Sequence, residues 1–248
     1  MSGRRIVPCL DVKGGRVVKG VQFKGLRDMG HPPEMAAEYE RQGASELTIL
    51  FIGREPREQT LEMLREAVSR VSMPLTVGGG IGSVEDMRAV LEAGAAKASI
   101  ASAALSDPGL IDRCAAEFGS EQVVVAIDAR RSADGWEVYS QGGKTPTGRD
   151  ALEWALEAQE RGAGELLLTS MDADGTKDGY DLALTGAASE ALDIPVIASG
   201  GCGSMEHVLM VLKETKAAGA LAASIFHQGQ HSVGELRDYL RNNGITVR

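Results

Sequence analysis

Short runs of apolar and β-branched residues alternate along the chain with longer stretches in which apolar residues recur every three or four positions. The short runs predict buried strands, and the longer stretches predict amphipathic helices, among them 32–43, 84–94 and 151–162. Each of these three helical stretches ends in a glycine, which suits the left-handed residue that often follows a helix. The predicted strands cover residues 5–11, 46–52, 74–79, 97–102, 123–128, 165–170, 195–200 and 219–224. Alternating strands and helices over 248 residues predict an α/β fold, a (β/α)8 TIM barrel.

The two halves of the chain resemble each other, which indicates a barrel built from two homologous half-barrels. The run IVPCLD, which ends at Asp11, matches VVVAID, which ends at Asp128. PLTVGGGIGSVED matches PVIASGGCGSMEH at an offset of 121 positions. Since no linker or low-complexity segment separates the halves, we expect one domain over residues 1–248, with repeats over about 1–119 and 120–248.

Composition and charge narrow the class of ligand. A formal net charge of −9 and an aromatic content of 4% disfavour nucleic-acid binding. The three cysteines share no CxxC spacing, so neither a disulfide framework nor a zinc cluster is indicated. The N-terminus lacks a secretion signal, and no run reaches the roughly 18 apolar residues of a membrane span. We therefore expect a cytoplasmic protein that contacts neither nucleic acid nor membrane and holds no metal.

Two Gly-Gly-x-Gly-Ser turns follow the third and seventh predicted strands and lead into helices. Backbone N–H groups at a helix start, together with the helix dipole, bind anions. Two related turns at one barrel mouth predict a small ligand with two phosphate groups. The alternative is that the glycines only make short connections. The candidate substrate-binding residues in these turns, at the ends of the fourth, sixth and eighth strands and in the loop after the sixth are Gly80, Ser102, Thr169, Asp174, Gly175, Gly201, Gly203 and Ser224.

Asp11 and Asp128 end the first and fifth predicted strands, which lie opposite each other at the mouth where barrel enzymes place catalytic groups. A substrate stretched between the two phosphate sites would pass between these carboxylates, one donating a proton and the other accepting one. Each aspartate alone fits equally well as a strand-end cap or a partner of a nearby cation. Lys19 lies in a long glycine-bearing segment that we expect to be a mobile loop, where it would contact substrate or remain a solvated lysine.

Charged residues begin four of the predicted strands, at the barrel end opposite the mouth: Arg5, Glu46, Lys97 and Glu165. Charges gathered at the bottom of a barrel indicate a stabilising ring of ion pairs.

Segments spread over the whole chain resemble the cyclase subunits of imidazole glycerol phosphate synthase, a lyase of histidine biosynthesis. They are RIVPCLDVKGGRVVKG, PLTVGGGI, VVVAIDARR, GWEVYSQGGKTPTG, GAGELLLTSMDADGTKDGYD, IPVIASGGCGSMEH and ALAASIFH. The resemblance implies that ammonia from a glutaminase partner, bound as a heterodimer, attacks a bis-phosphorylated ribulosyl aminoimidazole carboxamide without any cofactor. The products would be imidazole glycerol phosphate and an aminoimidazole carboxamide ribotide. It also implies that Asp11 and Asp128 are the acid/base pair, that Lys19 contacts substrate, and that the charged ring gates ammonia.

Three residues depart from that family pattern. Phe51 replaces an aspartate expected to face the mouth, and the next loop reads GREPREQT in place of the usual TAS type. Ala101 replaces an asparagine beside the first phosphate, and Ala96 replaces an aspartate that faces the glutaminase. These changes predict a weaker first phosphate site and weaker docking of the partner. Two alternatives stay open: an Amadori-type phosphoribosyl isomerase of the same barrel family, and a divergent or engineered phosphate-binding barrel with impaired catalysis.

Overall fold

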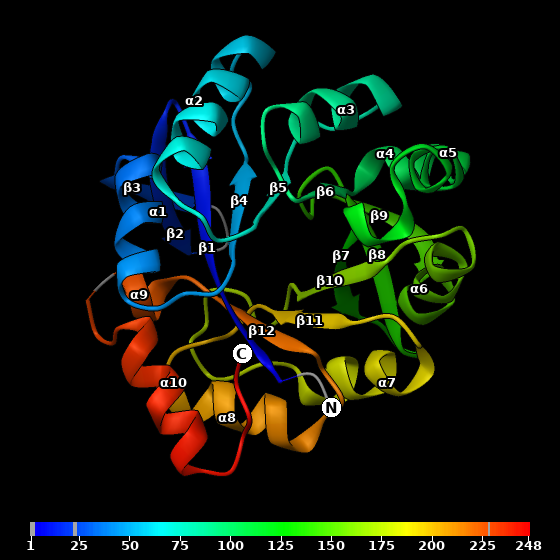
Figure 1. Cartoon of the computed structure of the whole chain (residues 1–248). Helices are drawn as coiled ribbons and strands as arrows, with labels where there is room; N and C mark the ends of the chain where they lie inside the picture. The colour runs from blue at the N-terminus through cyan, green and yellow to red at the C-terminus, as the bar shows by residue number, and fades with distance from the viewer. Residues whose placement is uncertain (1–2, 22–23, 228) are drawn as a thin grey trace.

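Eight parallel strands form a closed barrel in the computed structural model, which describes residues 3–21, 24–227 and 229–248 (Figure 1). The barrel strands are β1 (Arg5–Lys13), β4 (Leu47–Phe51), β5 (Leu75–Gly78), β6 (Lys97–Ile100), β7 (Val123–Arg131), β10 (Glu165–Ser170), β11 (Val196–Ser199) and β12 (Gly219–Ala222). Each strand pairs in parallel with the next, and the β7–β10 and β12–β1 pairs close the ring. The predicted α/β barrel is confirmed, and each strand predicted from the sequence overlaps one of these strands.

Helices surround the barrel (Figure 1). They are α1 (Pro32–Arg41), α2 (Arg57–Arg70), α3 (Val84–Glu92), α4 (Ser102–Ser106), α5 (Gly109–Phe118), α6 (Ala151–Glu160), α7 (Leu182–Ala191), α8 (Met205–Glu214), α9 (Ser224–His227) and α10 (Val233–Asn242), with a short 3-10 turn η1 (Ser120–Gln122). The three helices named from the sequence are confirmed as α1, α3 and α6. Gly43, Gly94 and Gly162 follow them with φ angles of 90°, 106° and 104°, so each terminal glycine takes the left-handed conformation.

Two β-hairpins rise from the barrel, and the first of them lies where the sequence led us to expect a loop. They are β2 (Arg16–Val21) with β3 (Lys24–Gly30), and β8 (Trp136–Ser140) with β9 (Thr145–Asp150). Gly14 and Gly15 have φ angles of 59° and 73° and reverse the chain directly after β1, so Val17 pairs with Val12. The segment after the first strand, expected to be a mobile loop, therefore forms a hairpin in its described part, and its mobility stays a prediction. The hairpins follow β1 and β7, the equivalent strands of the two halves.

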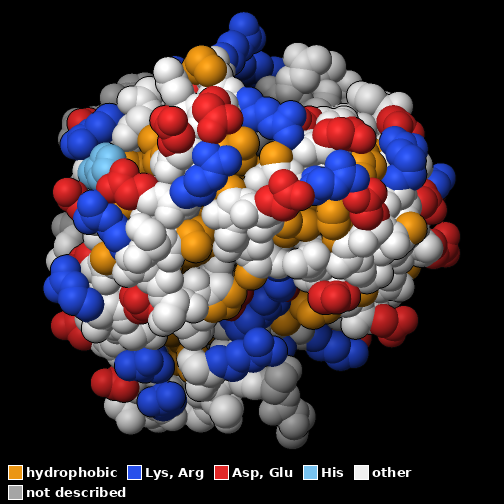
Figure 2. Space-filling view, turned by 45° about the horizontal axis from the view of Figure 1, so that its top comes forward, with side chains coloured by type: hydrophobic (Ala, Val, Ile, Leu, Met, Phe, Trp, Pro, Cys, Tyr) orange, Lys and Arg blue, Asp and Glu red, His pale blue; other side chains and the backbone are white. Residues whose placement is uncertain are grey.

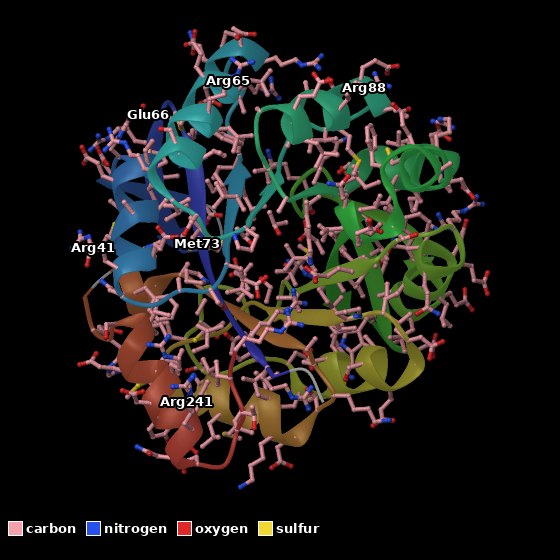
Figure 3. The ribbon with its side chains drawn as sticks, viewed as in Figure 1. Arg41, Arg65, Glu66, Met73, Arg88 and Arg241 are labelled. Carbon is pink, nitrogen blue, oxygen red and sulfur yellow. The ribbon has the colours of Figure 1, made fainter. Side chains whose placement is uncertain are left out.

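The side chains of each barrel strand alternate between two buried layers. The outer layer lies between strands and helices and includes Leu64 and Trp154, each fully buried. Burial of a side chain of that size contributes about 1.5–3 kcal/mol. In Figure 3, Met73 lies within the ring of helices, whereas Arg65 of α2 and Arg88 of α3 point outward. The barrel interior holds a second, smaller cluster: Val7, Cys9, Val124, Leu167, Ile197, Leu221 and Ala223.

The surface carries charges of both signs, interspersed over the face shown in Figure 2. Several belong to ion pairs between neighbouring helices, such as Arg88 of α3 with Glu117 of α5. The chain ends meet beside β1, where the Arg4 amide donates to the Thr246 carbonyl at 2.7 Å. Within the described ranges, no helix combines the length and apolar character needed to cross a membrane.

Candidate active site

Asp11 and Asp128 occupy equivalent positions on opposite sides of the barrel. Asp11 lies on β1 and Asp128 on β7, and these two strands are separated by three others in either direction around the ring. Both residues are partly buried. Asp11 Oδ1 lies 3.9 Å from Cys9 Sγ, which can donate a weak hydrogen bond to it from the interior cluster. The two carboxylates therefore lie across one mouth, as their matching sequence positions predict.

Asp128 has an environment suited to proton exchange near neutral pH. Burial, and to a lesser extent the negative charge of Asp174, together raise its pKa to about 6. Thr169 is the register partner of Asp128 on the neighbouring strand β10. Sequence reasoning assigned Asp174 to phosphate contacts only. Its influence on Asp128 depends on the path of the loop after β10, which no sequence motif specified.

The first glycine turn connects β5 to α3. Gly79 and Gly80 have φ angles of 100° and 71°. A Cβ on Gly79 would lie 2.0 Å from the Phe51 carbonyl oxygen, so only glycine fits there. A Cβ on Gly80 would have no atom within 4 Å, so its backbone is open to a ligand. Ser83 caps α3, because its Oγ accepts a hydrogen bond from the Asp86 amide at 3.1 Å.

Ser102, at the start of α4, is held by the hairpin that follows β7. Its Oγ accepts a hydrogen bond from the Gln141 amide at 2.8 Å. Gln141 stands in the β8–β9 turn with a φ of 55°, uncommon for a residue other than glycine. A hairpin of the second half thus fixes a candidate binding residue of the first. The accepted bond leaves the Ser102 hydroxyl hydrogen available to a ligand. Sequence reasoning missed Gln141, although the QGGK turn was a signal for the hairpin.

The second glycine turn connects β11 to α8 and repeats the first. Gly200 and Gly201 have φ angles of 91° and 100°. A Cβ on Gly200 would lie 2.6 Å from the Ser170 carbonyl, which matches the contact of Gly79 with Phe51 in the first half. Ser204 caps α8 by accepting from the His207 amide at 3.3 Å.

The loop after β10 covers the second turn. A Cβ on Gly201 would lie 1.9 Å from the Gly179 carbonyl, and one on Gly203 would lie 2.2 Å from the Lys177 carbonyl. Gly200 and Gly201 are consequently buried, whereas Gly79 and Gly80 are exposed. The two phosphate-site candidates therefore share a backbone design but differ in their access to solvent.

The remaining candidate binding residues flank this second turn. The Asp174 amide donates to the Ser170 carbonyl at 3.0 Å, and Gly175 follows with a φ of 77°. Ser224 begins α9, just after β12, and is partly buried. Lys19 pairs with Arg27 through the backbone of β2 and β3, but its side chain lies outside the part of the chain that the structure describes.

The charged ring forms at the other end of the barrel. Arg5 contacts Glu46 at 3.2 Å and Glu165 at 2.6 Å, and Lys97 Nζ lies 2.7 Å from Glu165. Arg5 and Glu165 are each 5% exposed. Burial raises the pKa of Glu46, although the Arg5 charge partly opposes this. The predicted ion-pair ring is therefore present, and a cavity of about 300 Å³ lined by Arg5, Lys97 and Glu165, among others, adjoins it.

Three polar side chains that sequence reasoning missed lie along one side of the barrel interior. Thr48 of β4, Thr76 of β5 and Ser99 of β6 are all buried. Alternate residues of a barrel strand point into the interior, and these three side chains occupy such inward-pointing positions, as Glu46 and Lys97 do. The opposite wall is the apolar cluster of Val7 and its neighbours. The alternation of polar residues within ELTIL, PLTVGG and KASIAS was the available signal.

The three departures from the family pattern lie in different environments. Phe51 belongs to the outer apolar layer, so its side chain packs under the helices and does not face the mouth. Ala101 is exposed just before α4. Ala96 is partly buried next to Lys97, at the end of the barrel that carries the charged ring. A weaker first phosphate site therefore stays a prediction that rests on Ala101 rather than on Phe51.

Metal-ligating residues do not gather in the described part of the chain, where no group of three or more His, Cys, Asp or Glu could hold an ion.

Comparison with known proteins identifies the family. The model of the histidine biosynthesis protein family matches residues 5–232. The imidazole glycerol phosphate synthase subunit HisF of Trichormus variabilis is 54% identical over 254 aligned residues, covering 100% of this chain and 99% of that protein. The resemblance inferred from sequence motifs is thereby confirmed. The chain belongs to the histidine biosynthesis protein family, in the group of HisF subunits.

Proposed function

We propose that this chain is the cyclase subunit of an imidazole glycerol phosphate synthase, a lyase that uses ammonia to cyclise a bis-phosphorylated aminoimidazole carboxamide ribotide. The observation that carries the proposal is the matched pair of glycine turns flanking two opposed aspartates. β5 and β6 carry one turn and its serine, β11 and β12 carry the other, and these strand pairs are opposite in the ring. Such spacing fits a substrate with a phosphate at each end.

Each phosphate is bound mainly by backbone N–H groups. Gly80 and Ser102 serve the first phosphate, and Gly201 and Ser224 serve the second. Gly203 contributes to the second site by shaping the turn, since its amide donates to His207 Nδ1. The α3 and α8 dipoles add to the attraction, because both helices start at these turns. Asp174 and Gly175, from the loop after β10, complete the enclosure of the second phosphate.

Asp11 and Asp128 transfer the protons that ring closure and bond cleavage require. With a pKa of about 6, Asp128 exchanges protons readily near neutral pH. Asp11 faces it from the other side of the mouth, so each carboxyl reaches a different side of the same substrate. Thr169 lies beside Asp128 and orients the substrate by hydrogen bonding. Lys19, on β2, contacts the anionic substrate from the hairpin above β1.

Ammonia enters at the charged ring and travels through the barrel. Arg5, Glu46, Lys97 and Glu165 form the gate, and the cavity beside them is the point of entry. Beyond the gate, the hydroxyls of Thr48, Thr76 and Ser99 offer hydrogen-bond partners to a small polar molecule. The apolar opposite wall excludes bulk water. A glutaminase subunit docks on this end of the barrel and delivers ammonia there, with Ala96 weakening the contact.

The test is an assay of the purified chain with the bis-phosphate substrate, with and without ammonium salt. The proposal predicts imidazole glycerol phosphate only when ammonium is present. Addition of a glutaminase subunit should allow glutamine to replace the salt. Turnover that needs no ammonia would identify an isomerase instead, and binding without turnover would identify a non-catalytic barrel.

A further inference from the structure

The two glycine turns differ in the charge of one equivalent residue. In the first turn, Asp86 Oδ2 accepts hydrogen bonds from the Gly82 amide at 3.1 Å and from the Ser83 hydroxyl at 3.0 Å. In the second, His207 Nδ1 accepts from the Gly203 amide at 3.1 Å. Asp86 and His207 are separated by the same 121 positions that relate the two turns. A carboxylate therefore stands in one turn where the other has an imidazole.

A carboxylate at this point opposes the binding of a phosphate. Both groups are negative, and both are attracted to free amides and to the positive end of the same helix dipole. Asp86 therefore lowers the affinity of the first turn for an anion unless a cation balances its charge. His207 imposes no such repulsion on the second turn.

Arg57, the first residue of α2, supplies that cation. Its Nη1 lies 3.1 Å from Asp86 Oδ1, and its Nη2 donates to the Glu85 carbonyl at 2.7 Å. The guanidinium thus bridges the side chain of Asp86 and the backbone of the first turn of α3. Arg57 comes from GREPREQT, the segment that departs from the family pattern, and it adjoins the phosphate site that has lost a donor at Ala101.

We infer that Arg57 is a positioning residue for the first phosphate: its pairing with Asp86 offsets the carboxylate charge, so that this turn accepts a phosphate. The inference rests on the proposed function, because it assumes that the two turns hold the two phosphates. Arg57 does not itself touch the phosphate in this account. Its side chain is 54% exposed and that of Asp86 is 29% exposed, so solvent screening limits the effect to roughly twofold to fivefold in affinity.

The experiment follows backbone amides in a proton–nitrogen correlation spectrum during titration with inorganic phosphate at constant ionic strength. The Gly80 amide reports the first turn, and the Gly201 amide reports the second. Arg57→Gln should raise the dissociation constant seen at Gly80 by roughly twofold to fivefold and leave the value at Gly201 unchanged. Arg54→Gln is the matched control, since it removes the same charge from an exposed residue of the same segment.

Asp86→Asn removes the negative charge of this side chain while keeping its size and shape. It should tighten phosphate binding at Gly80, and combined with Arg57→Gln it should restore at least the parent affinity. Equal behaviour of Arg57→Gln and Arg54→Gln, or weaker binding in Asp86→Asn, would overturn the inference while leaving the proposed function intact. Failure of both Gly80 and Gly201 to respond in the parent would instead remove the phosphate sites, and with them the proposed function.

Discussion

Replacement of Asp128 by asparagine should stabilise the fold while removing catalysis. A carboxyl whose pKa rises from 3.8 to about 6 on folding destabilises the folded state by about 3 kcal/mol once it is ionised in both states. Well below pH 4 the group is protonated in both states, so it costs nothing. Between about pH 4 and pH 6 the unfolded chain has released the proton while the folded chain still holds it, so stability falls over this range and is constant above it. Asparagine carries no charge at any of these pH values and avoids that cost.

The assay is urea unfolding of the parent and Asp128→Asn at several pH values from 4 to 8, a range that spans the two pKa values of 3.8 and about 6. The variant should gain up to about 3 kcal/mol at the upper end, and its advantage should shrink as the pH falls. Asp134→Asn, at an exposed position in the turn before β8, is the matched control and should show no such trend. A difference between Asp128→Asn and the parent that does not vary with pH would refute the reasoning.

Four further substitutions test the packing, the ring and the first phosphate site. Gly201→Ala should cost more than about 3 kcal/mol in thermal unfolding, because its Cβ would lie 1.9 Å from a carbonyl oxygen. In Gly80→Ala the new Cβ would meet no neighbour, so the variant should lose only about 1–2 kcal/mol of stability, because of the positive φ. Equal losses of stability in the two variants would contradict the conclusion that the loop after β10 covers only the second turn. Glu165→Gln should cost about 2–4 kcal/mol, since Arg5 remains buried with one partner fewer; an unchanged urea midpoint would argue against a structural ring. Ser102→Ala should raise the KM for the bis-phosphate roughly twofold to tenfold with kcat preserved in steady-state assays, and an unchanged KM would remove Ser102 from the first phosphate site.

The barrel strands and the duplicated plan were predictable from the sequence because both depend on local patterns. Buried parallel strands appear in the sequence as short apolar runs, and the repeated glycine turns mark the ends of equivalent strands. The opposed aspartates followed from those patterns, since the ends of equivalent strands must face each other in a ring of two halves. The ring of Arg5 and its partners followed from charged residues at strand starts.

Features that depend on long-range packing were not predictable in the same way. The contact of Gln141 with Ser102 requires a hairpin of one half to reach the other. The effect of Asp174 on Asp128 depends on how one loop folds over the mouth. Phe51 is different, because the alternation of Glu46, Thr48 and Leu50 already assigned it to the outer layer. Attention to strand parity would have kept it away from the phosphate site.

Kinetics of Asp11→Asn and Asp128→Asn test most directly the claim that two opposed carboxyls act on a substrate held at both ends. The assay is turnover of the bis-phosphate with ammonium salt, together with its binding to each variant. The account predicts that kcat falls by at least about a hundredfold in both variants while the bis-phosphate still binds about as well as to the parent. Parent-like kcat in either variant, or a loss confined to binding, would contradict it.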